Sequence, residues 1–292
     1  MLDPLRARFP WSTPLSDENP DIEPLRPEDL GGLRLPWLSK FSSETLDIQM
    51  RANPGMALWV PKTGEYIVAE RWRRRDDIGH IVEVTARKGK GALVKAILEG
   101  MREQDNKLAL LSDEVRSDQP RLYDDIGFGP VEKIVFFQRE LKGGDLGVVE
   151  SALPKLKYRV AEQDDLDLLI QLDHGSFPWL WWNSPEDMGV YMGADGVWVY
   201  VAWLDRLPVG YASFTMYNGW AHLDRLAVVE EQQGRKYGAA QLNHALGAMI
   251  ALGAGHVGLS TQENNVQSHK LYRGFGFRQT RDSMNIYGIA LD

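Results

Sequence analysis

The segment Leu223–Ala240 (LDRLAVVEEQQGRKYGAA) limits the possible folds of this chain more than any other stretch. Its first part, Leu223–Val229, is rich in leucine and valine and predicts a buried strand. A charged elbow containing Gly234 follows, and a strand that passes through such an elbow into a helix directs several backbone N–H groups at one point. That point suits a phosphate or a pyrophosphate. The helix is predicted because apolar residues recur on one helical face, at Leu242, Ala245, Leu246, Met249 and Ile250.

Two patterns in the C-terminal half resemble signatures of the GNAT superfamily of acyl-CoA N-acyltransferases. The elbow Gln233–Gly238 is similar to the family's Gln/Arg-x-x-Gly-x-Gly/Ala signature, and Asn265–Phe277 is similar to its Asn-x-x-Ala-x-x-Leu-Tyr-x-x-x-Gly-Phe pattern. Two positions depart from the family. Lys236 replaces the first signature glycine, where a Cβ atom disfavours positive φ and close approach to the backbone, and Ser268 replaces the alanine. The elbow alone also fits an ordinary strand-turn-helix, but the two patterns together identify residues 155–292 as similar to a GNAT domain.

The motif around Tyr272 has an earlier copy, Leu122–Phe128 (LYDDIGF), about half a chain length upstream. Strand, glycine-containing elbow, helix and strand recur before it in the same order. We therefore predict an α/β (α+β) protein with two tandem GNAT folds, each a mixed, mostly antiparallel central sheet flanked by helices. The expected division is a proline-rich arm over residues 1–36, a first domain over 37–145, a linker near 142–154 and a second domain over 155–292.

The first copy lacks the residues that carry the family's chemistry. Arg116 and Gln119 occupy the positions of Asn265 and Ser268, and the elbow Arg87–Ala92 is one residue shorter than its C-terminal counterpart. Glycines and lysines remain in this elbow, so it could still hold a phosphate. We expect instead a degenerate domain that keeps the fold and supports the second site. The preceding run Arg71–Arg75 (RWRRR) is predicted to be a solvent-exposed rim at the end of an edge strand rather than a phosphate or nucleic-acid site.

Composition excludes several function classes. A net charge of −8 and a pI near 5.4 argue against nucleic-acid binding, which needs a basic surface. The absence of cysteine excludes disulfides, thiolate metal sites and an acyl-cysteine intermediate. The resemblance implies direct acyl transfer within a ternary complex. No signal peptide is evident, and the most apolar strand, Val197–Leu204, is too short to span a bilayer. We expect a cytoplasmic protein without a metal or a membrane partner.

The resemblance implies a site for acetyl-CoA or another acyl-CoA. The elbow would hold the pyrophosphate, with positive charge from Arg235 and Lys236. In the family, the strand before the elbow bulges away from its neighbour and opens a wedge for pantetheine, and the Val228 N–H would face the thioester carbonyl. The expected cofactor-binding residues are Ala227, Val228, Gln233, Gly234, Arg235, Lys236, Tyr237, Gly238, Ala239, Asn265 and Ser268.

The catalytic candidates are Tyr272, His222 and Asp224. By the resemblance, Tyr272 is the general acid, and a phenol with a pKa near ~10 can protonate a thiolate of similar basicity; it could instead be a core tyrosine. His222 and Asp224 are separated by two positions on a strand and so share one sheet face. Either could accept the amine proton, either could be a structural partner of Arg225 or the loop, and the reaction could use no side-chain base.

The acceptor side is expected around the aromatic residues Phe177, Trp179, Trp181 and Trp182. Phe177-Pro178-Trp179 resembles the Phe-Pro-Trp of protein N-terminal alanine acetyltransferases, and the tryptophans could bind a peptide, sugar or amine cation or simply cover the core. The predicted function is N-acyl transfer, with acetyl as the expected group, to a small amine or a peptide N-terminus by a monomer or homodimer. The alternatives are an enzyme resembling mycothiol synthase, acting on a small aminoglycoside or cysteinyl acceptor, and a non-catalytic CoA-binding or interaction module.

Overall fold

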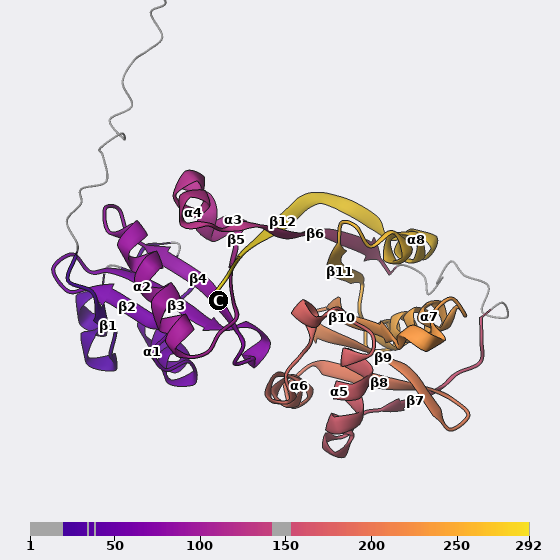
Figure 1. Ribbon diagram of the computed structural model, residues 1–292. Helices are drawn as coiled ribbons and strands as arrows, with labels where there is room; N and C mark the ends of the chain where they lie inside the picture. The colour runs from indigo at the N-terminus through magenta and orange to yellow at the C-terminus, as the bar shows by residue number, and fades with distance from the viewer. Residues whose placement is uncertain (1–19, 34, 38, 142–152, 292) are drawn as a thin grey trace, which may run out of the picture. The chain divides into compact units, whose positions relative to one another are not determined.

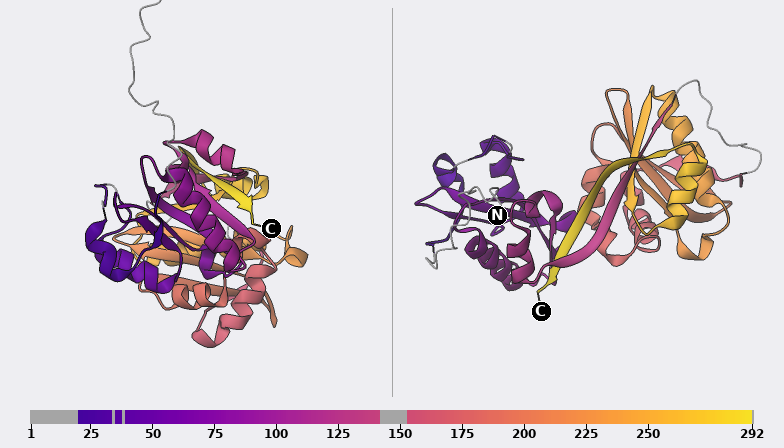
Figure 2. Two further views of the ribbon diagram at one scale, coloured as in Figure 1. Left: turned by 60° about the vertical axis from the view of Figure 1, so that its left-hand side comes forward. Right: turned by 90° about the horizontal axis from the view of Figure 1, so that it is seen from above.

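The computed structural model describes residues 20–33, 35–37, 39–141 and 153–291, which form two compact units. The first unit contains the chain up to Arg71, Asp76–Gly129 and the residues from Gly288 onward, and the second contains Trp72–Arg75 and Pro130–Tyr287. In each unit helices pack against a sheet (Figure 1 and Figure 2). Residues 1–19 of the predicted arm and most of the predicted linker lie outside the described residues.

The first unit is built on strands in the order β1-β2-β3-β4-β5. Their pairings are antiparallel except for the parallel pair β4–β5. Helix α1 begins after Ser42, whose hydroxyl accepts a hydrogen bond from the Thr45 N–H in a capping box. The strands are β1 (Glu23–Pro24), β2 (Ala57–Val60), β3 (Glu65–Arg71), β4 (Ile78–Thr85) and β5 (Leu108–Ser112), and the helices are α1 (Ser43–Ala52), α2 (Lys90–Glu103), α3 (Asp113–Arg116) and α4 (Pro120–Ile126).

The second unit has the strand order β12-β6-β11-β10-β9-β8-β7. From β6 to β7 the neighbours are antiparallel except for the parallel pair β10–β11. The strands are β6 (Gly129–Glu140), β7 (Lys157–Val160), β8 (Val197–Leu204), β9 (Leu207–Tyr217), β10 (Trp220–Val228), β11 (His256–Gln262) and β12 (Arg278–Ala290), and the helices are α5 (Leu166–His174), α6 (Pro185–Met192), α7 (Tyr237–Ala251) and α8 (Val266–Gly274).

Strand β6 follows the first repeat in sequence, but from Pro130 onward it belongs to the second unit. It pairs antiparallel with β11, from His256 opposite Glu140 to Gln262 opposite Ile134. The sheet that carries the elbow motif therefore contains a strand from upstream of residue 142.

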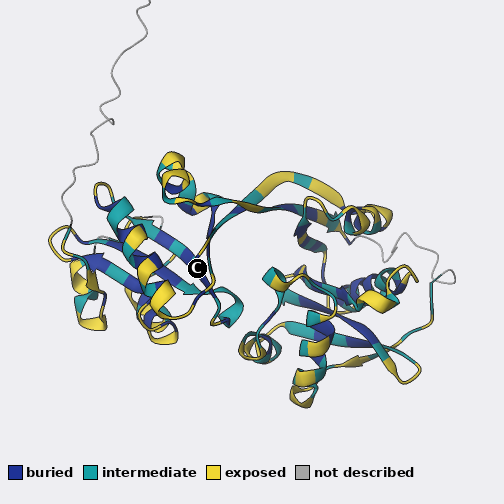
Figure 3. Cartoon of the chain, in the orientation of Figure 1, coloured by how far each residue is buried: buried dark blue, intermediate teal, exposed yellow. Residues whose placement is uncertain are grey.

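The core of the second unit lies between α7 and the central strands. Leu242, Ala245, Leu246 and Met249 are fully buried against residues of β10 and β11, which confirms the predicted amphipathic helix. Ile250 is partly buried at the edge of the same cluster. Strand β9 is mostly dark blue in Figure 3, because its residues from Val209 to Phe214 are buried. The mixed, mostly antiparallel sheet flanked by helices confirms the predicted fold class.

Candidate active site

Strands β10 and β11 separate halfway along their length. They pair in parallel only from Trp220 opposite His256 to Leu223 opposite Leu259. At the same point the register of β10 against β9 shifts between Leu223 and Arg225, which marks a β-bulge at Asp224. Beyond the bulge β10 stays paired with β9 but no longer with β11, so a gap opens between two parallel strands.

The backbone of Val228 is directed toward this gap. Val229 donates to the Val209 carbonyl of β9 at 3.1 Å, which fixes the alternation of the β9–β10 ladder. Val228, opposite Gly210, therefore occupies a non-hydrogen-bonded position, and its N–H and C=O point away from β9. The Val228 carbonyl accepts a hydrogen bond from the Gln233 side chain at 3.0 Å.

A cavity of about 820 Å³ occupies the gap. Sheet residues form its floor, the elbow and the start of α7 form one wall, α8 forms another, and the segment 176–181 closes the side near β10. The lining residues are Arg73, Glu132, Ile134, Ser176, Phe177, Pro178, Trp181, Leu223, Asp224, Arg225, Leu226, Val228, Gln233, Gly234, Lys236, Tyr237, Gly238, Ala239, Ser260, Thr261, Gln262, Asn264, Asn265, Gln267, Ser268, Leu271 and Tyr272.

The elbow leads into α7 through two left-handed residues. Gly234 has φ of 75°, and Lys236, the N-cap of α7, has φ of 62°. Lys236 thus adopts a left-handed conformation despite its Cβ atom, at a cost of roughly 1–2 kcal/mol. Its side chain makes no capping hydrogen bond. The first-turn amides of α7, at Tyr237–Ala239, have no intrahelical acceptors and lie along the cavity wall.

Tyr272 lies on α8 at the opposite wall. It is 6% exposed and packs against Phe137 and Phe277, with ring centroids 6.0 and 5.8 Å away. Burial raises the pKa of Tyr272 to about 12, against a smaller opposing effect of the Ser268 hydroxyl. The phenol is therefore protonated at neutral pH. Asn265 caps α8, because its side-chain oxygen accepts the Ser268 N–H at 3.1 Å.

His222 and Asp224 form a hydrogen-bonded pair. His222 Nδ1 lies 2.7 Å from Asp224 Oδ1, and Asp224 Oδ2 accepts from the hydroxyls of Tyr191 at 2.6 Å and Thr215 at 2.7 Å. Burial and the adjacent carboxylate raise the pKa of Tyr191, which keeps it a donor. Asp224 lines the cavity, whereas the half-exposed His222 is not among the lining residues. With both oxygens of Asp224 engaged, the carboxylate can fix the orientation and tautomer of the imidazole.

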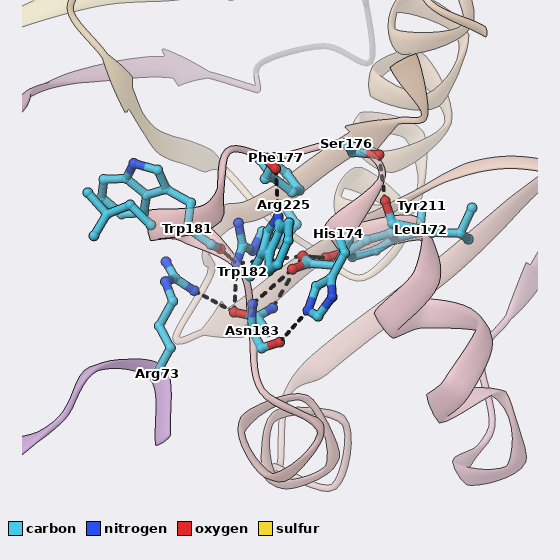
Figure 4. A network of polar contacts seen from close by, with 12 residues as sticks. Arg73, Leu172, His174, Ser176, Phe177, Trp181, Trp182, Asn183, Tyr211 and Arg225 are labelled. Carbon is cyan, nitrogen blue, oxygen red and sulfur yellow. Dashed lines mark hydrogen bonds and ion pairs between the residues drawn. The ribbon is translucent and has the colours of Figure 1, made fainter. Parts of the chain in front are cut away.

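A buried polar network lies behind the segment 176–181 at one side of the cavity (Figure 4). Asp173 is fully buried and accepts from the Asn183 N–H at 2.9 Å and the Tyr211 hydroxyl at 2.5 Å. Arg225 lies 3.6 Å from Asp173 and donates to the Asn183 side-chain oxygen at 2.6 Å. Arg73 donates to the same Asn183 oxygen at 2.5 Å.

The prediction of a solvent-exposed rim at Arg71–Arg75 is wrong for Trp72–Arg75. Arg73 and Arg74 have left-handed φ angles of 53° and 52°, and the segment contacts residues 179–187. The Trp72 indole donates to the Leu180 carbonyl at 2.8 Å, and the Arg75 guanidinium lies 4.4 Å from the Trp179 ring. The run contacts protein rather than water because arginine stems are apolar and guanidinium groups stack on aromatic rings.

The structure brings most of the predicted site residues to one cavity. Of the aromatic candidates, Phe177 and Trp181 line it, whereas Trp182 stacks on His174 at 4.3 Å and Trp179 is 42% exposed. Ala227 is buried, and its carbonyl accepts from Gln241 at 2.9 Å instead of facing the cavity. The predicted site residues that do not line the cavity are His222, Ala227, Arg235, Trp179 and Trp182.

The lining also contains residues that the sequence did not single out. Arg73 and Glu132 come from upstream of residue 142, so no local pattern connects them to the elbow. The strand pattern predicts Arg225 only as a possible partner of His222 or Asp224. For Arg73 a signal existed, because a tryptophan within an arginine run favours stacking as well as solvation.

In the first unit, side chains of the protein itself contact the elbow that corresponds to Gln233–Gly238 of the second unit. The Glu65 carboxylate accepts from the backbone N–H groups of Arg87 at 2.7 Å and Lys88 at 3.4 Å, so an anion already occupies this elbow. Lys90 is buried at the start of α2 and pairs with Asp118. Tyr123, the counterpart of Tyr272, is fully buried, and its hydroxyl has no hydrogen-bond partner among the described residues.

Comparisons with known proteins agree with this geometry. Residues 162–277 match the model of the acetyltransferase (GNAT) family. No curated protein matches the chain. A GCN5-related N-acetyltransferase from Sphaerobacter thermophilus has a similar structure, with a TM-score of 0.63 and 15% identity over 94% of this chain and 96% of that one.

Two further structures extend the likeness. A GCN5-related N-acetyltransferase from Kribbella flavida gives a TM-score of 0.62 at 12% identity over 93% of this chain and 72% of that one. A tandem GNAT protein from the clavulanic acid biosynthesis pathway gives 0.56 at 12% identity over 93% and 98%. The likeness is one of fold, and it covers both repeats.

The described residues contain no helix that is long and apolar enough to cross a membrane. Within the same residues, no group of three or more histidine, aspartate or glutamate side chains is placed to hold a metal ion.

Proposed function

Because residues 162–277 form a GNAT acetyltransferase domain, we propose that this chain transfers an acyl group, acetyl by expectation, from acyl-CoA to a primary amine. We assign the reaction to the second unit. The observation that carries the proposal is the separation of β10 and β11 beyond Leu223, next to first-turn amides of α7 that have no intrahelical acceptors. A gap that ends at a helix N-terminus suits a ligand with an extended arm and a pyrophosphate.

The residues present fit acyl-CoA. The amides of Tyr237–Ala239 and the charge of Lys236 would hold the pyrophosphate, and the Val228 N–H would hold an acyl carbonyl. A Cβ atom added to Gly238 would lie 3.7 Å from Leu271 and 3.7 Å from Val228, so α7 starts close to both walls of the gap. Asn265 and Ser268 lie on the far wall.

Two further groups would manage protons. When bound, acyl-CoA supplies the thioester, whose sulfur needs a proton as it leaves. Tyr272 holds such a proton at neutral pH because burial raises its pKa to about 12. Asp224 holds His222 in one orientation at 2.7 Å, and we propose that His222 takes the amine proton, directly or through water.

Release of CoA thiol tests the function. The chain has no cysteine, so a thiol-reactive chromophore reports only the product. Purified protein with acetyl-CoA and a panel of small amines, amino acids, amino sugars and short peptides should release thiol faster with at least one acceptor than without. Tight acetyl-CoA binding with no acceptor-dependent release across the panel would instead indicate the non-catalytic CoA-binding module.

A further inference from the structure

Two guanidinium groups meet at the acceptor side of the cavity (Figure 4). Arg73 Nη1 and Arg225 Nη2 donate to the same neutral oxygen, Asn183 Oδ1, at 2.5 and 2.6 Å. Both arginines line the cavity. Two cations that share one neutral acceptor repel each other, and the repulsion is strong because both are largely removed from water.

Asp187 and Asp173 offset part of this charge. The Asp173 carboxylate is 3.6 Å from Arg225, but its oxygens already accept from Tyr211 and Asn183. Among the described residues the Arg73 guanidinium makes one hydrogen bond and no ion pair, and its Nε–H is buried without an acceptor. An arginine has five N–H donors, so most of the donors of Arg73 remain available.

Aromatic rings hold both guanidinium groups in place. Arg225 lies 4.4 Å from the centroid of Phe177, and Arg73 lies 5.3 Å from Trp181 and 5.7 Å from Trp72. Burial and the charge of Arg225 lower the pKa of Arg73 to about 10, so it remains protonated at neutral pH. The arginine pair, Arg73 and Arg225, is thus a fixed, positively charged surface.

The same cavity carries carboxylates. Glu132 accepts a hydrogen bond from the Trp181 indole, and Asp224 lies at the bulge of β10. Burial raises the pKa of Glu132. A ligand with one positive and one negative group matches this surface, whereas a phosphate dianion would be repelled by Glu132 and Asp224.

We propose that the amine acceptor also carries a carboxylate, as a free amino acid or a short peptide does, and that the arginine pair binds that carboxylate. The planar fork of a guanidinium matches a carboxylate in two parallel hydrogen bonds. This inference rests on the proposed acyl transfer, because it identifies the second substrate of the same site.

Matched acceptors test the inference. The kcat/KM for thiol release is measured with amino acids of several side chains, with the corresponding amino-acid amides and with dipeptides. The amide keeps the amine and removes only the negative charge, and its amine is the less basic of the two, so intrinsic reactivity does not favour the acid. We expect the carboxylate form to be better by about 10- to 100-fold. Comparing kcat/KM for dipeptides with kcat/KM for single amino acids then shows whether the carboxylate belongs to a short peptide or to a free amino acid.

Arg73→Gln keeps a hydrogen-bond donor and removes the charge. It should reduce the preference for the acid over the amide to within about threefold, mainly through KM, without changing the acetyl-CoA dissociation constant measured by calorimetry. Arg74→Gln is the matched control, because Arg74 pairs with Glu186 at 3.0 Å and does not line the cavity. It should keep the preference of the unaltered protein.

The possible failures are distinguishable. The inference is overturned if kcat/KM for the amide equals or exceeds that for the acid, or if the preference for the acid survives Arg73→Gln. Either result leaves the proposed acyl transfer intact. If no amine supports turnover, calorimetry of amino acids against the protein saturated with CoA still decides the matter. Binding that is lost with the amide and with Arg73→Gln supports the arginine pair, and equal binding of acid and amide refutes it.

Discussion

Replacing Tyr272 with phenylalanine should separate catalysis from binding. The substitution deletes one hydroxyl and keeps the ring, whose contacts with Phe137 and Phe277 hold it in the core. Loss of the Ser268 interaction should cost no more than about 1 kcal/mol of unfolding free energy. A positioned general acid contributes about 10²- to 10⁴-fold to rate, so we expect kcat to fall at least about 100-fold, or about 2.7 kcal/mol in activation free energy.

The thiol-release assay measures this loss, and calorimetry checks that the acetyl-CoA dissociation constant changes by less than about twofold. The first repeat supplies a matched control, Tyr123→Phe, because the Tyr123 hydroxyl is buried without a partner. That variant should keep full activity and equal or higher stability. Because the pKa of Tyr272 is raised to about 12, its ionisation should not lower kcat between pH 7 and roughly pH 10. Unchanged kcat in Tyr272→Phe would refute its role as the acid.

Three further outcomes follow from the structure. Gly210→Ala should destabilise the second unit by about 3 kcal/mol or more in urea unfolding, because the new Cβ atom would lie 1.9 Å from the Ala227 oxygen. The control Gly247→Ala, whose Cβ atom would have nothing within 4 Å, should be neutral or stabilise by up to about 1 kcal/mol. Equal stabilities of the two variants would contradict the packing. His222→Ala should lower kcat/KM by about 100-fold or more, and an unchanged kcat/KM would exclude His222 as the base. Burial raises the pKa values of Tyr66 and Tyr272 to about 12, so the folded state binds these two protons more tightly than the unfolded state. The free energy of unfolding should therefore be independent of these groups below pH ~10 and fall toward pH ~12. Melting temperatures that do not change over this range would argue against buried phenols.

Local patterns predicted the elements that position the site. The strand, elbow and helix of Leu223–Ala240 depend on hydrophobic spacing and glycine placement, both of which are local in sequence. In the structure Tyr272 lies on α8 and lines the cavity, and its role as the general acid stays a prediction. The conformation of Lys236 was not predictable in this way, because its left-handed φ of 62° contradicts the preference of a residue with a Cβ atom.

The side of the cavity lined by Arg73 and Glu132 depends on contacts between distant parts of the chain. Glu132 reaches the cavity because β6 pairs with β11, and Arg73 reaches it because two left-handed residues turn the chain toward residues 179–187. Neither pairing leaves a periodic signal. Ala227 shows the complementary limit, since alternation along a strand gives the side-chain face but not which edge its carbonyl faces.

Calorimetric titration of the purified, CoA-free protein with acetyl-CoA tests the central claim most directly. One site per chain is expected, because Glu65 already occupies the elbow amides of the first unit. Gly238→Trp should abolish that site by filling the gap between Val228 and Leu271, while Gly238→Ala, whose Cβ would make ordinary 3.7 Å contacts, should retain it. Two sites per chain, no binding at all, or binding that survives Gly238→Trp would contradict the assignment of acyl-CoA to the cavity between β10 and β11.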